Sequence, residues 1–476
     1  MLSRRELLAL TLVFAVSLPA VTTRLYSSDE VQYFSYLRSL WFDRDVSFEN
    51  EYRYFYDHQI AQSAGYHETF LERQTATSRR VNYATLGCAI LWAPFYAVAD
   101  LSVRARRALG SEVAADGYSR PYVAAVAYGS AFYGFAAILL AIGAARRIVG
   151  PRALSSGLAV WAGTPLLFYI YVAPPFSHAC SAFAVALFVT VWLHVRPAWT
   201  LAGVIALGFA GALMAMVREQ DLFLLVGPVL DFALALRTGA PARSVARSVS
   251  LAVAGGAAFG VAFIMGYLPQ LLAYSALNGS SHRILGVAYA GPASDVQRKM
   301  SWHAPHALQV LLSPEHGFLF WTPLAVIALA GLAILAAGRP GRTLPETRRV
   351  GGCMLLMVAS QVYISGAVES WTVAGAFGQR RFVAVTIFLV VGLAAARAAA
   401  TGRIARPVMR AFIILSVYWN IALMAEFGTL MMVRQRLELR RNAYDALVTL
   451  PRAAPGLVYR YLMHRESFYR PPATVR

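Results

Sequence analysis

The sequence predicts an all-α integral membrane protein with about eleven transmembrane helices. Hydrophobic residues make up 58% of the 476 residues and charged residues only 14%, whereas soluble globular domains carry roughly 25% charged residues. The mean hydropathy is +0.52. Several apolar runs reach the roughly 20 residues that a helix needs to cross about 30 Å of hydrocarbon. Helices are favoured there because a helix satisfies its own backbone hydrogen bonds.

The first apolar run follows Arg4 and Arg5 and is expected to span the membrane at about 7–24. A signal peptide is the alternative for this run, because it is short and basic at its front, but it shows no clean small-x-small cleavage site. The further expected spans lie near 119–145, 153–172, 178–195, 199–217, 221–237, 248–274, 317–337, 350–368, 382–400 and 410–433.

The largest expected non-spanning piece is a first external loop at about 25–118. In this loop, Val31–Phe42 places apolar side chains near one helical face, as an interfacial amphipathic helix does. Leu86–Leu101 contains Pro94 and is expected to lie along the membrane, with a short span as the alternative. A second long external loop is expected at about 275–316. The transmembrane domain would thus cover 1–433, followed by a basic tail at 434–476.

The net charge of +19 does not indicate a nucleic-acid partner, because the basic residues sit mostly in short breaks between apolar runs. With a cytoplasmic N-terminus, alternate breaks collect Arg146, Arg147, Arg196 and Arg397, which is the positive-inside pattern. The tail is the exception, since this count places it outside and one miscounted span would move it inside. Cys88, Cys180 and Cys353 are too few and too scattered for a disulfide framework or a zinc site.

Polar clusters fall at the external ends of the expected spans. Ionisable groups at a membrane boundary indicate function, although snorkelling explains an isolated one. We expect these clusters to line one cavity. The candidate residues are Asp29, Glu30, His178, Arg218, Gln220, Asp221, Glu315, His316, Glu369, Gln379, Arg380 and Arg381.

Asp29 and Glu30 open a helix directly after the first span, where a carboxylate meets the partial positive charge of a helix start. Two interpretations stay open. Ser27 and Glu30 match the S-x-x-E capping box, so the acidic pair would only fix the helix start. Alternatively, the pair is catalytic.

Arg218 stands with Asp221 in a tight turn between two apolar runs. It would either bind phosphate through its guanidinium or form a structural ion pair with Asp221. Arg380 and Arg381 follow a small-residue loop that suits close approach of an anionic head group, and snorkelling is the alternative. The position of His178 beside two prolines favours a cap or packing residue over a metal ligand. The other histidines lack a zinc-like arrangement.

With these residues in view, the chain resembles the GT-C superfamily of polyprenyl-phosphate-sugar glycosyltransferases, such as the protein O-mannosyltransferases and the lipid A aminoarabinose transferases. The family signature is an acidic pair just after the first span, and Asp29-Glu30 in SSDEVQYFSYLRSL matches it. LGCAILWAPFY, at 86–96, resembles the family's juxtamembrane helix but lacks its frequent Pro-Pro-Leu sequence. Looser similarity to uncharacterised bacterial members lies in PPFSHACSAF, MVREQDLFLLVGPVLD, SPEHGFLFWTP and SWTVAGAFGQRRF.

The resemblance implies a GT-C-like helical core and a hydroxyl acceptor, on a glycan, lipid or protein, that approaches from the external side. We expect Asp29 to take a proton from this hydroxyl while its oxygen attacks C1 of the donor sugar with inversion. Glu30 would orient the acceptor or Asp29, and Arg218, Arg380 and Arg381 would stabilise the leaving lipid phosphate. Some related enzymes use a divalent metal ion and others do not, so metal dependence stays open.

The expected location is the bacterial inner membrane, with several spans and the active site facing the periplasm. A transporter or flippase for a lipid-linked or anionic substrate is the alternative from another class. Transport requires alternating access from two sides, whereas these polar clusters gather on one. A non-catalytic assembly subunit is a third interpretation, under which Asp29 would be dispensable.

Overall fold

The computed structural model describes residues 2–58, 60, 64–238, 245–279, 300–338 and 345–468. Across these ranges the regular structure is helical, and strand-like pairing is limited to two isolated bridges, Gln74–Arg80 and Met300–Val368. The all-α prediction is therefore confirmed. Much of the expected second external loop, 280–299, and the end of the tail, 469–476, lie outside the described residues.

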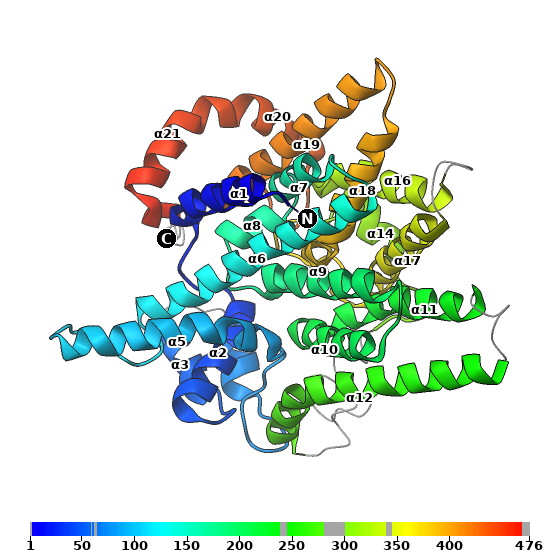
Figure 1. Cartoon of the computed structure of the whole chain (residues 1–476). Coiled ribbons are helices and arrows are strands. Elements are labelled where there is room, and N and C mark those ends of the chain that lie inside the picture. The colour runs from blue at the N-terminus through cyan, green and yellow to red at the C-terminus, as the bar shows by residue number, and fades with distance from the viewer. Residues whose placement is uncertain are drawn as a thin grey trace.

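Helices follow one another along the whole described chain (Figure 1). The first part comprises α1 (Arg4–Ser17), η1 (Leu18–Ala20), α2 (Ser28–Arg38), η2 (Ser39–Asp43), α3 (Glu49–Asp57), α4 (Ala64–Tyr66), η3 (His67–Glu72), α5 (Gly87–Ala108) and α6 (Arg120–Ile148). The middle part comprises α7 (Ala153–Ala162), α8 (Leu166–Tyr171), α9 (Ser177–Val195), α10 (Leu201–Val217), η4 (Glu219–Leu225), α11 (Val226–Thr238) and α12 (Val245–Asn278). The last part comprises α14 (Ala307–Leu312), α15 (Phe318–Trp321), α16 (Leu324–Ala337), α17 (Pro345–Ala367), η7 (Arg380–Val385), α18 (Thr386–Ala399), α19 (Ala405–Gly428), α20 (Leu439–Tyr444), η8 (Asp445–Thr449), α21 (Leu450–Met463) and η9 (Arg465–Phe468).

Seven helical segments in the described residues are long and apolar enough to cross a membrane. Six of them coincide with expected spans, and shorter apolar helices, α7, α10 and α16, fall within three more. The seventh is α5, which we had expected to lie along the membrane although its length and composition suit a span. The chain is thus an integral membrane protein. The count of eleven spans stays a prediction.

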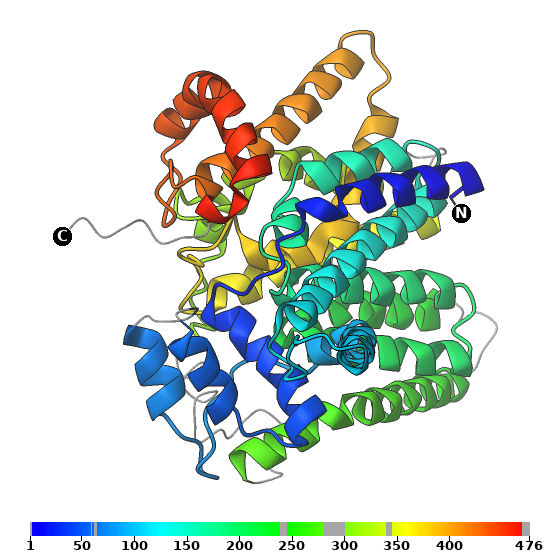
Figure 2. The same cartoon turned by 90° about the vertical axis from the view of Figure 1, so that its left-hand side faces the viewer.

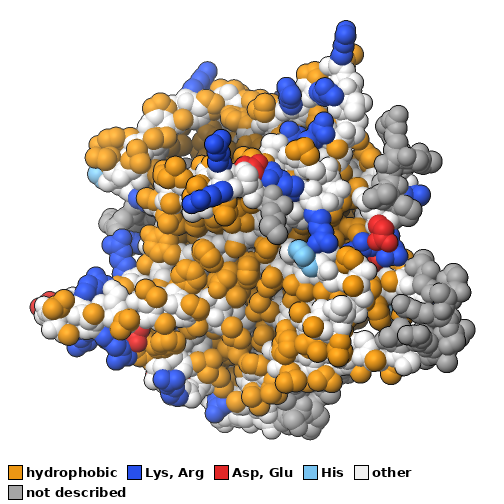
Figure 3. All heavy atoms as spheres, in the orientation of Figure 1, with side chains coloured by type: hydrophobic (Ala, Val, Ile, Leu, Met, Phe, Trp, Pro, Cys, Tyr) orange, Lys and Arg blue, Asp and Glu red, His pale blue; other side chains and the backbone are white. Residues whose placement is uncertain are grey.

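Ion pairs and loop contacts distinguish the two ends of the helical bundle. At one end, Arg146 at the end of α6 pairs with Glu6 near the start of α1 at 2.6 Å, and Arg397 at the end of α18 donates to Ser155 near the start of α7. At the other end, Asp29 and Arg218 follow the ends of α1 and α10. We call this second end the site end. Figures 1 and 2 show the helices running between the two ends, and Figure 3 shows the broad hydrophobic surface along their length.

Small residues allow the central helices to approach closely. A Cβ added to Gly331 of α16 would lie 1.8 Å from the carbonyl oxygen of Gly392 of α18, and one added to Gly392 would lie 2.0 Å from that of Ala328. Close approach of this kind provides the van der Waals contact that holds helices together in lipid. Large side chains at either glycine would separate the two helices.

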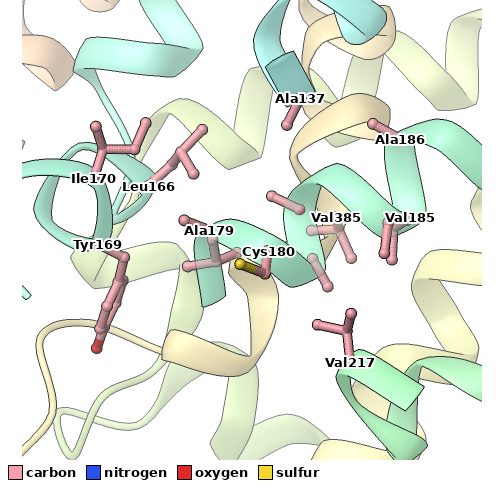
Figure 4. Close-up of a cluster of buried hydrophobic side chains, with 14 of the residues drawn as sticks. Ala137, Leu166, Tyr169, Ile170, Ala179, Cys180, Val185, Ala186, Val217 and Val385 are labelled. Atoms are coloured by element: carbon pink, nitrogen blue, oxygen red, sulfur yellow. The ribbon is translucent and has the colours of Figure 1, made fainter. Parts of the chain in front are cut away.

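A buried apolar cluster leads directly to the site end (Figure 4). Its side chains come from α6, α8, α9, the end of α10 and η7, and they include Tyr169, Ala179, Val217 and Val385. Ala179 follows His178 in the chain, and Val217 precedes Arg218. The core therefore fixes the backbone from which these polar side chains project.

The first loop folds onto the bundle rather than onto lipid. Val31 and Phe34 of α2 are fully buried, and Phe34 packs edge-on against Phe55 of α3 and Tyr96 of α5. The apolar face that we had assigned to the membrane interface is thus covered by α3 and α5. Sequence periodicity identifies an apolar face but not what covers it, which explains the difference.

The tail lies at the site end. Arg465 donates to the carbonyl oxygens of Pro19 and Ala20 at 2.7 and 2.5 Å, just beyond α1, and Asn442 donates to Glu426 of α19 at 2.6 Å. Figures 1 and 2 show the tail as an arc between α19 and α1 on the outside of the bundle.

Candidate active site

The two acidic residues at the start of α2 have different environments. Ser27 is the N-cap: its hydroxyl accepts from the backbone N–H of Glu30, and the Glu30 carboxylate accepts from the N–H groups of Ser27 and Tyr26 at 3.0 and 2.6 Å. The capping box is therefore present, with Glu30 fully buried in it. Burial raises the pKa of Glu30 to about 7. The side chain of Asp29 is outside the box and 40% exposed.

Asp29 forms an ion pair with Arg380, whose Nη1 lies 2.7 Å from Oδ2 of the carboxylate. Arg380 begins η7, after a turn in which Gly378 has a φ of +61° and leaves no room for a Cβ against Pro165. Only glycine adopts this conformation at low cost. The turn thus carries Arg380 to the start of α2, and its guanidinium also lies over the ring of Phe176 at 5.7 Å.

Arg218 forms a hydrogen bond with His178, which lies at the start of α9. Its Nη1 lies 2.6 Å from Nδ1 of His178, and its Nη2 donates to Gln220 at 3.1 Å. Because a guanidinium only donates, Nδ1 of His178 is the acceptor and the ring is neutral. His178 is buried, and its ring packs against those of Tyr169 and Phe176.

The site carries more positive than negative charge. Arg381 interacts electrostatically with Arg380, Arg218 and Asp29. The cluster therefore contains three guanidinium groups, one partly exposed carboxylate and, behind Arg218, the buried Asp221. Arg381 is itself buried and donates to the carbonyl and hydroxyl oxygens of Ser370 at 2.8 and 2.9 Å. Such an excess of guanidinium groups suits a bound anion, above all a phosphate.

The expected pair between Arg218 and Asp221 is absent from the described residues. Asp221 is buried and instead accepts a hydrogen bond from Ser181 of α9 at 2.6 Å. This hydrogen bond joins η4 to α9, so Asp221 has a structural role behind Arg218. Arg218 and Asp221 thus make no direct ion pair in the described residues, although they interact electrostatically.

The remaining predicted residues lie around the site rather than in it. His316 is buried, stacks on Trp321 and contacts the carbonyl oxygen of Ala376 at 2.9 Å, and burial lowers its pKa to about 4. Gln379 is buried and donates to the carbonyl oxygen of Trp371 at 3.0 Å. Both support the turn before Arg380. Glu315 and Glu369 are exposed.

Sequence reasoning missed three aromatic side chains of the site: Tyr33, Tyr169 and Phe176. Tyr33 interacts electrostatically with Arg218 and Asp29, and burial raises its pKa to about 12. It follows Asp29 by four positions on the same helix, which places both on one face. That spacing was the available signal. Phe176 stands two positions before His178 in PPFSHACSAF, so that segment was a signal as well. Tyr169 gave none, because its neighbours Phe168 and Ile170 are apolar residues of the core.

A cavity of about 970 Å³ adjoins the site. Tyr169 and Phe176 line it and also contact His178, so they form the shared wall between the cavity and the arginine cluster. Other aromatic side chains come from α3, α8 and α19. Its basic side chains are Arg24, Arg120 and Arg434. The cavity therefore combines aromatic walls with basic residues. In the described residues no group of three His, Cys, Asp or Glu side chains is arranged to hold a metal ion.

Two solved structures are similar to this chain. Both are ArnT from Cupriavidus metallidurans. The structure bound to undecaprenyl phosphate has a TM-score of 0.49 and 14% identity and covers 94% of this chain and 75% of that chain. The structure in the apo state has a TM-score of 0.46 and 15% identity, covering 93% and 74%. The chain matches no protein-family model, and no curated protein matches it.

Proposed function

We propose that this protein is a membrane glycosyltransferase that moves a sugar from a polyprenyl phosphate to a hydroxyl group. The ion pair between Asp29 and Arg380 carries this proposal, because it joins a partly exposed carboxylate to a cluster of guanidinium groups whose charge suits a phosphate. A transferase of this kind requires a base for the acceptor and positive charge for the departing phosphate. The acidic motif after the first apolar helix agrees with the resemblance to the GT-C superfamily.

In the proposed reaction, Asp29 removes the proton of the acceptor hydroxyl as that oxygen forms a bond to C1 of the sugar. The bond between C1 and the phosphate oxygen breaks, and the electron pair leaves with the lipid phosphate. Attack opposite the leaving group inverts the anomeric centre. Arg380 and Arg218 stabilise the charge that develops on the phosphate.

Arg380 links the two halves of this reaction. Its guanidinium contacts the Asp29 carboxylate at 2.7 Å, and the same group would contact the donor phosphate.

Glu30 and Arg381 serve positioning roles under this proposal. Glu30 fixes the start of α2, and Arg381 fixes the turn from Ser370 onward. The aromatic cavity beside Tyr169 and Phe176 would receive a substrate, since aromatic faces suit the apolar faces of sugars and prenyl groups. We further propose that the site end faces the periplasm from the bacterial inner membrane.

Mass spectrometry of a deletion strain tests the proposed function. We expect a polyprenyl-phosphate sugar to accumulate and one envelope glycan, lipid or protein to lose that sugar, both restored by the wild-type gene. Unchanged envelope glycosylation, with no accumulated donor, would contradict the proposal. A donor that accumulates only on the cytoplasmic leaflet would favour a flippase instead.

A further inference from the structure

α21 presents three different faces. The first face lies against the protein and has four residues at helical spacing. Three of them are partly buried, and the fourth donates a hydrogen bond from its hydroxyl to the carbonyl oxygen of Ala20. They are Leu450, Ala454, Leu457 and Tyr461. A second face carries exposed apolar side chains: Pro451, Pro455, Val458 and Leu462. The third carries Arg452, Gly456 and Arg460, with the exposed side chains of Tyr459 and Met463 along its border with the second face. A helix with one face on protein, one apolar and one basic is placed where protein, lipid and water meet.

The apolar face of α21 is large, and no described part of the chain buries it. Val458 is 56% exposed and Leu462 72% exposed, and no residue of α21 is buried. Water solvates such a face poorly.

The lipid-facing surface of the bundle continues onto this face. Arg465, two residues after α21, is bonded to the backbone just beyond α1. The adjoining surface of α1 is apolar and exposed, with Leu12 at 65% and Val16 at 73%. Figure 3 shows hydrophobic side chains on both the arc of the tail and the helices beneath it.

The charge of the tail fits an anionic surface. Residues 434–468 contain seven arginines and three acidic residues. Arg440 and Arg452 are exposed and have no carboxylate partner among the described residues. Basic side chains near a membrane attract anionic head groups by about 1 kcal/mol each.

We propose that α21 lies in the bilayer interface at the site end, with Val458 and Leu462 among the acyl chains and the arginine face toward anionic phospholipid head groups. The tail thereby acts as a lipid-anchored part of the cavity wall, because Arg434 and Phe468, on either side of α21, both line the cavity. This inference does not depend on the proposed chemistry.

Spin labels on the full-length protein test this placement. The native cysteines at 88, 180 and 353 are buried, so single labels can be placed at Leu462→Cys and, as the matched control, at Gly456→Cys, where an added Cβ meets open space. The protein is reconstituted in vesicles of phosphatidylcholine and phosphatidylglycerol. Power saturation then compares accessibility to oxygen, which partitions into lipid, with accessibility to a water-soluble nickel chelate.

We expect the Leu462 label to be accessible to oxygen and shielded from nickel, and the Gly456 label to show the reverse. Omitting phosphatidylglycerol, or introducing Arg440→Gln with Arg452→Gln, should raise nickel accessibility at Leu462 severalfold. Equal nickel accessibility at the two positions would overturn the proposal, because the apolar face would then be in water. Shielding of Leu462 from both probes would also overturn it, because protein would cover the face.

Discussion

Nη1 of Arg380 lies 2.7 Å from Oδ2 of Asp29, although 351 positions separate the two residues in the sequence. This contact joins the start of α2 to the start of η7 and brings the carboxylate to the arginine cluster. Asp29 is not the helix cap, since Ser27 and Glu30 form the capping box. The sequence left capping and catalysis as rival explanations of one acidic pair. Capping belongs to Ser27 and Glu30, so it does not explain Asp29, to which we assign the proposed catalytic role.

Removing the charge of Arg380 should affect donor use far more than stability. Its side chain is 26% exposed and that of Asp29 40% exposed, and ion pairs at such exposure contribute about 1 kcal/mol or less. We expect Arg380→Met to melt within a few degrees of the wild type but to use donor at least tenfold less well, with Arg380→Lys intermediate. Thermal unfolding and donor kinetics measure the two effects. A large loss of stability with normal kinetics would make the pair structural.

His178 should act through Arg218. Arg218→Ala is expected to lower donor use by about 10- to 150-fold, the range for a hydrogen bond to a charged group. His178→Phe keeps an aromatic ring but removes the acceptor that holds Nη1 of Arg218, so its effect should be smaller. The double variant should be no worse than Arg218→Ala alone. Additive losses in donor kinetics would show that His178 acts independently.

The buried carboxyl group of Glu30 should make the free energy of unfolding depend on pH. Burial raises its folded-state pKa to about 7 from an ordinary value of 4.5, so its stabilising contribution is complete below about pH 4.5 and is lost as pH rises through 7. Glu30→Gln keeps a capping oxygen but does not titrate. Its melting temperature should rise relative to the wild type between pH 5 and 8, by the equivalent of at most about 3 kcal/mol. A constant difference across that range would contradict the raised pKa.

Cysteine labelling in intact cells tests which way the protein faces. Ala114 precedes α6 at the site end, and Thr401 lies between α18 and α19 at the opposite end; both are exposed. A membrane-impermeant maleimide should label Ala114→Cys in intact cells and Thr401→Cys only after lysis. The reverse pattern would place Asp29 in the cytoplasm and remove the proposed acceptor.

The helical class and the approximate positions of most long apolar helices were predictable from the sequence, because apolar runs in lipid have few alternatives to helix. The proximity of Asp29, Arg218 and Arg380 was predictable only as a shared end of several spans. Their partners were not. Asp221 stands three positions from Arg218, yet it bonds Ser181 instead, because chain separation does not reveal which way a 3₁₀ turn directs its side chains.

The same limit applies to covered surfaces. The sequence of α2 does not show whether its apolar face contacts lipid or, as in the structure, α3 and α5. Apart from Phe176, the aromatic residues that line the cavity also could not be distinguished in the sequence from ordinary core residues. Tyr33, which does not line the cavity, differs in that its spacing from Asp29 was a usable signal, because it places both side chains on one helical face.

Turnover by purified Asp29→Asn protein tests the central claim most directly. The donor is the polyprenyl-phosphate sugar accumulated by the deletion strain, and the measurement is release of polyprenyl phosphate in the presence of its acceptor. Asn keeps the size of the side chain but cannot accept the proton, so we expect wild-type folding and a turnover lower by about 10² or more. Glu30→Gln, assayed beside it at pH 6, should lose less. Full turnover by folded Asp29→Asn protein would contradict the account.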